Sequence, residues 1–126
     1  MGVFARSFRT IIFYKETTMS KIEELIQGHE RVWFYLKDEQ TKARFVQDVN
    51  ALGCIYLNGE HLNIRNCYHI MAVHPDRKLA QVKIFIWNAS FQTANFTPFP
   101  LRVDYAKLIS GADDWFCKES EFIPIG

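Results

Sequence analysis

An uninterrupted apolar run occupies residues 32–36, between Arg31 and Lys37, and consists of residue types with high β propensity. The two-residue period of a strand places Val32, Phe34 and Leu36 on one face and Trp33 and Tyr35 on the other. Because both faces then carry large apolar side chains, the pattern predicts a strand over residues 31–37 that is partly covered on both sides.

A helical period follows this strand directly. Asp38 is a typical N-cap residue, and Glu39 would lie next to the positive end of the helix. Gly53 follows the last apolar position and would end the helix. The apolar positions at helical spacing are Phe45, Val46, Val49 and Leu52. The pattern predicts an amphipathic helix over residues 38–52 as the main helix of the chain.

A first β-hairpin is predicted after Gly53. Residues 54–57 and 60–64 would form its strands, and Asn58-Gly59 would form its turn. Asn and Gly tolerate positive φ, which makes this dipeptide a strong signal for a two-residue hairpin loop.

A second hairpin would join residues 67–73 to residues 79–87. The connecting residues 74–78 include Pro and Asp, which favour turns. Alternation along the last strand would put Val82, Ile84 and Ile86 on one face.

The C-terminal third is less regular. Residues 88–100 contain two prolines and no clean period, so we interpret them as a long connection. Residues 101–103 favour a short strand, and Asp104 would cap a helical turn that ends at Gly111. Residues 112–126 carry no unambiguous pattern. The whole order predicts an α+β fold, an antiparallel sheet of about four to five strands with one main amphipathic helix packed on one face.

The first 18 residues are predicted to lie outside this fold. Back-translation of Lys15 to Met19 can give a purine-rich ribosome-binding sequence followed by a start codon. Residues 1–18 would then be a translated leader, and residues 19–126 a single α+β domain. An S-x-x-E capping box at Ser20 supports a start of ordered structure there. An organelle transit peptide, or an edge strand over residues 8–14, are the alternatives.

Composition narrows the class of protein. The chain has 126 residues, 48% hydrophobic and 15% aromatic, with a formal net charge of +1. This content can build a core, and no apolar run approaches the roughly 18 residues of a membrane span. A near-zero charge disfavours nucleic acid as a partner. Three cysteines without CxxC spacing indicate reduced thiols and a cytoplasmic protein.

The order of strand, acid-capped helix, Leu-Gly and Asn-Gly turn resembles small proteins encoded by phages and mobile elements of Gram-positive bacteria. The resemblance covers about residues 31–110, and Cys54 stands where the pattern has an aromatic residue. The matching segments are residues 32–36, 38–39, 45–54, 58–59, 67–70 and 103–109. The resemblance implies an accessory role in a mobile element and no established activity.

Several residues could carry chemistry, and each also has an ordinary structural explanation. Cys67 and His69 would share a strand face, and with Cys54, His61 or His74 they could form a mixed zinc site. The spacing lacks a zinc knuckle, so we predict no metal and no cofactor. Cys67 and His69 would make a poor nucleophile and base, because side chains at positions i and i+2 of a strand run parallel and need a third group to orient them. The turn that contains Asp76 could bind an anion, although such residues are typical of exposed turns.

The aromatic residues of the long connection lead to the functional hypothesis. Phe91, Phe96 and Phe99 would either cover a sheet face or form an exposed patch for a partner, with Arg102 beside them. We hypothesise a non-enzymatic protein-binding or inhibitor module whose partner is a host or element-encoded protein. The alternatives are a nucleic-acid accessory protein, and a small-molecule binder or enzyme near Cys67, His69 and Asp76. The oligomeric state stays open, including a homodimer through a sheet edge.

Replacing Phe91, Phe96 and Phe99 together by alanine is expected to abolish capture of a partner protein from a Gram-positive lysate, because the apolar anchors of the surface are removed. Pull-down with the wild type and the triple variant measures this, and circular dichroism checks that the variant is folded. Identical partners for the two proteins, or no partner for either, would contradict the hypothesis.

Overall fold

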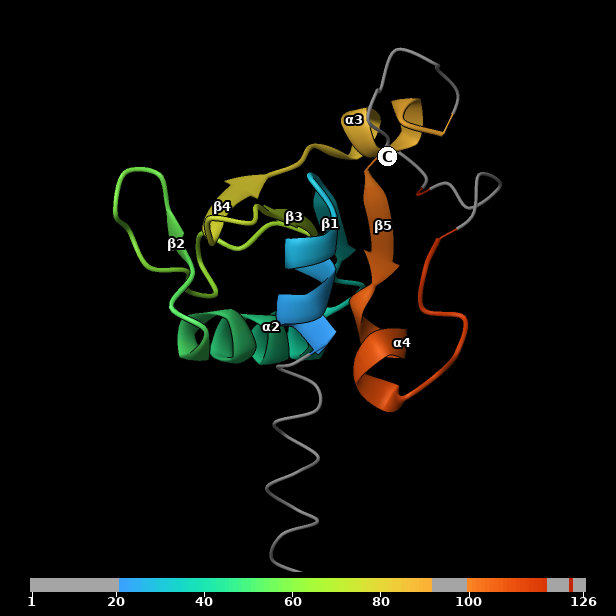
Figure 1. Cartoon of the computed structure of the whole chain (residues 1–126), viewed down its shortest axis with the longest axis horizontal. Helices are drawn as coiled ribbons and strands as arrows, with labels where there is room; N and C mark the ends of the chain where they lie inside the picture. Colours follow the sequence, from blue (N-terminus) through green and yellow to red (C-terminus); the bar gives the residue numbers. More distant parts are fainter. Residues whose placement is uncertain (1–20, 92–99, 118–122, 124–126) are drawn as a thin grey trace, which may run out of the picture.

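The computed structural model describes residues 21–91, 100–117 and 123, and contains helices and one five-stranded sheet (Figure 1). A helical segment spans residues 21–28. The named elements follow in this order: β1 (Val32–Tyr35), α2 (Glu39–Ala51), β2 (Ile55–Tyr56), β3 (Ile70–Val73), β4 (Lys78–Gln81), α3 (Ile84–Ala89), β5 (Leu101–Asp104) and α4 (Tyr105–Ser110). The α+β class predicted from the sequence is confirmed.

Strand β1 lies inside the sheet and separates two apolar cores. Its residues Val32 and Phe34 face a large core that also contains α2, α4 and the helical segment over residues 21–28. Trp33, on the opposite face, belongs to a smaller core with Ile70 and Trp87. The alternation expected from the sequence is therefore confirmed, and α3 supplies part of the cover on the second face.

The predicted caps of the two helices α2 and α4 are present. The Asp38 carboxylate accepts hydrogen bonds from the Thr41 backbone N–H at 2.8 Å and from the Thr41 hydroxyl at 2.6 Å. Asp104 accepts a bond from the backbone N–H of Lys107 at 3.3 Å. Gly111 ends α4 with a φ of 82°, a left-handed conformation that suits glycine.

The sheet is mixed rather than purely antiparallel. The strand order is β2-β4-β3-β1-β5, and the pairs β1–β5 and β2–β4 are parallel. Strands β3 and β4 form the predicted second hairpin, but residues 67–69, predicted as the start of its first strand, are not part of β3. Because β4 and β5 both run parallel to β1, the chain between them returns along the sheet, which a tight turn cannot achieve. The chain between β4 and β5 contains α3, and residues 92–99 of the predicted long connection lie outside the described residues.

Residues 84–89 form the helix α3, so the prediction of a strand over residues 79–87 is wrong beyond Gln81. A short run that is apolar at nearly every position fits a strand and a buried helix equally well. The helix buries Trp87 in the smaller core and leaves Phe85 exposed. Contacts with the sheet therefore decide the conformation of this segment.

The first predicted hairpin forms only at its turn. Gly59 has a φ of 88° and donates to the Tyr56 carbonyl at 2.9 Å. Beyond it, His61 makes a single bridge to Ile55, and β2 pairs with β4 instead. The Asn63 side chain accepts hydrogen bonds from two following backbone amides, at 2.9 and 3.1 Å. These local bonds turn the chain, so residues 60–64 do not form the predicted strand.

The outer edge of the sheet at β5 is partly covered by the chain itself. On the outer side of β5, the backbone of Asp104 donates to Trp115 at 2.6 Å and Cys117 donates to Arg102 at 2.8 Å. This side of β5 is therefore partly paired within the chain.

In the described ranges, no helix is long and apolar enough to cross a membrane. Ser20 and the predicted leader lie outside the described residues.

A buried polar cluster ties α2 to α4 inside the larger core. The Tyr105 hydroxyl donates a short hydrogen bond to the Asp48 carboxylate, which also accepts from the Arg44 guanidinium at 3.0 and 3.1 Å. The Tyr105 ring packs edge-on against Phe34 and Phe45. Because the carboxylate and the hydroxyl bond to each other, neither is left without a partner in the core, and the bond holds α4 against α2.

Tyr105→Phe is expected to lower the free energy of unfolding by about 1–2 kcal/mol, because it removes a buried hydrogen bond to a charged group. Urea denaturation followed by circular dichroism measures the change. Tyr68→Phe is the matched control, because Tyr68 is exposed and its hydroxyl forms no hydrogen bond within the described residues. Equal stability of the two variants would contradict the structural role of the cluster.

Burial, together with the hydrogen bond to Asp48, raises the pKa of Tyr105 above its ordinary value of 10.0. The folded state thus holds the phenol proton more tightly than the unfolded chain. This contribution to stability is fully present below a pH of about 10 and is lost as the pH rises above it. Stability of the wild type is therefore expected to fall more steeply at alkaline pH than that of Tyr105→Phe.

Candidate functional site

A recess of about 520 Å³ lies beside the first turn of α2 and the start of α3. It is lined by Lys42, Ile64, Arg65, Cys67, Tyr68, His69, Val82, Lys83, Ile84 and Phe85. This volume falls within the range of roughly 300–1,000 Å³ that is usual for ligand pockets. We refer to this surface as the recess.

The recess exists because two neighbouring chain segments diverge. At the end of the β3–β4 hairpin that lies away from its turn, the last hydrogen bond runs from the Val82 backbone N–H to the Ile70 carbonyl, at 3.0 Å. Beyond it, residues 67–69 lead away from the sheet and residues 83–84 turn into α3. No backbone hydrogen bond joins these two segments in the described chain. The hairpin thus opens into a cleft, and the first turn of α2 closes one side of it.

The walls of the recess are apolar and accessible. Phe85, Ile64 and Tyr68 are 55%, 46% and 45% exposed. They are three of the five large hydrophobic residues that are exposed in the described ranges. Such side chains scattered over a surface need no explanation, but a cluster of them around one depression marks a binding surface.

Three cations surround these apolar walls. Lys42 comes from α2, Arg65 from the segment before β3, and Lys83 from the start of α3. The Lys42 ammonium lies 3.4 Å from the Glu39 carboxylate. Arg65 and Lys83 are exposed and form no ion pair with any described residue. The recess therefore combines apolar contact area with a local excess of positive charge.

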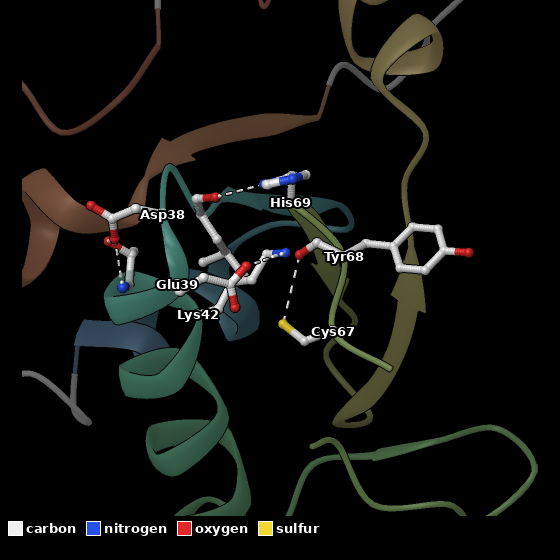
Figure 2. Close-up of polar contacts among 8 residues, drawn as sticks. Asp38, Glu39, Lys42, Cys67, Tyr68 and His69 are labelled. Atoms are coloured by element: carbon white, nitrogen blue, oxygen red, sulfur yellow. Dashed lines mark hydrogen bonds and ion pairs between the residues drawn. The ribbon is translucent and has the colours of Figure 1, made fainter. Parts of the chain in front are cut away.

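Cys67 and His69 both line the recess, but they do not form a nucleophile–base pair (Figure 2). The Cys67 thiol contacts the Tyr68 carbonyl at 3.6 Å. The His69 Nδ1 atom lies 3.3 Å from the Leu36 carbonyl, which accepts the hydrogen bond. Burial raises the pKa of Cys67 to about 11. Each group is thus directed to the backbone, and the thiol holds its proton near neutral pH.

The geometry bears on the zinc hypothesis as well. Among the described residues, no group of three or more His, Cys, Asp or Glu side chains is placed to hold a metal ion. Cys54 is buried in the larger core, whereas His69 is at the surface, so the proposed ligands are dispersed.

The turn between β3 and β4 serves the fold rather than the recess. Arg77 donates to the Leu52 carbonyl at 2.9 Å and to the Glu23 carboxylate at 2.8 Å. Asp76 accepts from the backbone of Lys78 at 3.1 Å. The turn therefore joins α2 to the helical segment over residues 21–28, and Asp76 does not line the recess.

The predicted aromatic site is only partly described. The Phe91 ring lies 3.9 Å from the Arg102 guanidinium and packs edge-on against Trp87. Arg102 also donates to the Ser90 carbonyl at 2.9 Å. These contacts are intramolecular and attach this region to the smaller core. Phe96 and Phe99 lie outside the described residues, so the role of the aromatic loop in binding stays a prediction.

A second hollow, of about 370 Å³, lies near β2 and is polar. Its side chains bond to one another's backbone: the Tyr56 hydroxyl donates to the Asn66 carbonyl at 2.5 Å, and Gln81 donates to the same carbonyl at 3.2 Å. Because its polar groups already satisfy each other, this hollow offers less to a ligand than the recess.

Sequence reasoning singled out Cys67 and His69 but missed the other contributors to the recess. Ile64 and Phe85 were assigned to regular strands, and Lys42 was one charge on a helix. The sequence signal that could have pointed to the recess is a cation close to an apolar residue. Lys83 and Phe85 are one such pair, and the Lys83 ammonium lies 6.0 Å from the centroid of the Phe85 ring. Ile64, Phe85 and Lys42 come together only because the two segments of the hairpin separate, and the sequence pattern does not show this separation.

Comparison of the chain with protein-family models, with curated proteins and with solved structures gave no match. The resemblance to mobile-element proteins is therefore an expectation from the residues alone, and the geometry of the recess carries the functional argument.

The Cys67 thiol is expected to react slowly with Ellman's reagent at about pH 8, because a pKa near 11 leaves about a hundredfold less thiolate than the ordinary value of 9.0 would. A Cys54→Ala, Cys117→Ala double variant isolates Cys67 as the reporter. Absorbance of the released thiolate gives the rate, and the same variant unfolded in urea is the control. Equal rates in the two states would contradict the protected thiol.

Proposed function

We propose that this chain is a non-enzymatic binding module that holds a short segment of a partner protein in the recess. The observation that carries the proposal is the clustering of Ile64, Tyr68 and Phe85 around one open depression. Exposed aromatic and aliphatic side chains of this kind supply most of the affinity in protein interfaces, because they lose contact with water on binding.

The backbone around the recess favours a peptide as the occupant. Tyr68 and Ile84 line the recess from its two diverging segments. Neither backbone N–H forms a hydrogen bond with any described residue. An extended peptide can supply carbonyl groups for such donors while its side chains occupy the apolar walls, as in peptide recognition at open sheet positions.

A non-enzymatic role is supported by the protected state of the Cys67 thiol and by the direction of the His69 hydrogen bond to the backbone. A small-molecule binder is the second candidate, because the volume of the recess also suits a drug-sized ligand. The accessory role in a phage or mobile element and the cytoplasmic location are part of this proposal, supported by the sequence alone.

An Ile64→Ser, Phe85→Ser double variant is expected to lose at least about tenfold in affinity for peptides selected on the wild type, because two apolar anchors are removed. The peptides come from panning a random peptide library on the wild-type protein. Fluorescence polarisation measures their binding. Both substituted side chains are about half exposed, so the fold should be retained, and circular dichroism checks this.

Leu57→Ser is the matched control, because Leu57 is 84% exposed and lies outside the recess. It should bind the selected peptides like the wild type. If the double variant also binds them unchanged, the site is elsewhere. If panning enriches no peptide, the chain is not a peptide-binding module.

A further inference from the structure

We infer that the segment held in the recess carries a carboxylate next to an apolar side chain, and that Lys42, Arg65 and Lys83 bind this carboxylate. The inference rests on the proposed function and specifies its ligand: an acidic, apolar peptide. It is drawn from the charges that the fold brings together rather than from the apolar walls.

The three cations come from separate parts of the chain and converge on one place. They belong to α2, to the segment before β3 and to the start of α3. Among the described residues, none that lines the recess is acidic. The chain as a whole has 15 basic and 14 acidic residues, so this imbalance is local and does not reflect a general excess of positive charge. An anionic ligand would be attracted to this position by complementarity.

Lys42 is the most unusual of the three cations. Only 10% of its side chain is exposed, and Glu39, its partner at 3.4 Å, is 75% exposed (Figure 2). A lysine whose side chain is largely buried favours a close anionic partner, because its ammonium has lost part of its hydration. A long contact with a solvated carboxylate meets this requirement only in part. The first turn of the 13-residue helix α2, which carries Lys42, adds positive potential.

A carboxylate fits these surroundings better than the phosphates of a nucleic acid. The cations surround a single depression and do not form the stripe that a phosphate backbone follows. Ile64, Val82 and Ile84 give the recess aliphatic walls that suit Leu or Phe beside an Asp or Glu. An oligonucleotide is therefore the competing outcome that the experiment has to exclude.

Glu39 then acts as an internal competitor for Lys42. Its carboxylate occupies the position that the ligand's carboxylate would take, on an exposed side chain that can move away without loss of buried area. Removing this charge should strengthen the binding of acidic peptides. A purely structural ion pair between residues i and i+3 would not predict that effect, because its removal would only weaken the helix slightly.

The test uses fluorescein-labelled peptide pools that share a fixed Leu or Phe and differ at one fixed neighbouring position, Glu, Gln or Lys. The wild-type protein is expected to bind the Glu pool about tenfold more tightly than the Gln pool, and this preference should decrease with added salt. Lys42→Met should lose most of the preference and still bind the Gln pool, because Arg65 and Lys83 remain and the substitution keeps the alkyl stem. Lys78→Met, on β4 and outside the recess, is the control and should behave like the wild type.

Three further arms decide between explanations. Glu39→Gln is expected to bind the Glu pool about two- to fivefold more tightly than the wild type. Equal binding of the Glu and Gln pools by the wild type would overturn the carboxylate inference, and it would leave the proposed function standing if Ile64→Ser, Phe85→Ser weakens both. Tighter binding of a single-stranded oligothymidylate than of the Glu pool would also overturn it. Absence of binding to every pool would overturn the proposed function as well.

Discussion

The structure depends on the burial of both faces of β1. Val32 and Phe34 on one side, and Trp33 on the other, are nearly inaccessible to water, so the strand requires a separate apolar layer on each face. Hydrogen bonds to β3 and β5 occupy both of its edges. A strand enclosed in this way constrains the order of the sheet, because placing β1 at an edge would expose these side chains to water.

The two layers are built differently, and the recess follows from the difference. The larger core has α2 and α4, joined through Asp48 and Tyr105, and forms a rigid base. The smaller core is closed by the short helix α3, which begins directly after β4. To reach that position the chain leaves the β3–β4 hairpin early, and the hairpin opens. The same step that covers Trp33 therefore exposes Phe85 and creates the recess beside α2.

Local signals predicted those elements whose determinants are adjacent in the sequence. Asp38 and Asp104 cap helices, and Gly111 ends one, because a cap involves only a few consecutive residues. The β1 strand was predictable because its apolar run consists of residues with high β propensity and is bounded by Arg31 and Lys37. Predictions failed for residues 60–64 and 84–87, where a short segment satisfied more than one period and the surroundings made the choice.

The sequence by itself determined the α+β class, the strand β1 with its two apolar faces, and the main helix. Hydrophobic periodicity and capping chemistry act within a few residues and are therefore written along the chain. Only the tertiary structure decided which strands pair in parallel, that residues 84–89 form a helix, and that Lys42, Arg65 and Lys83 share one recess. These features depend on contacts between residues far apart in the sequence, where burial of the smaller core outweighs weak local preferences.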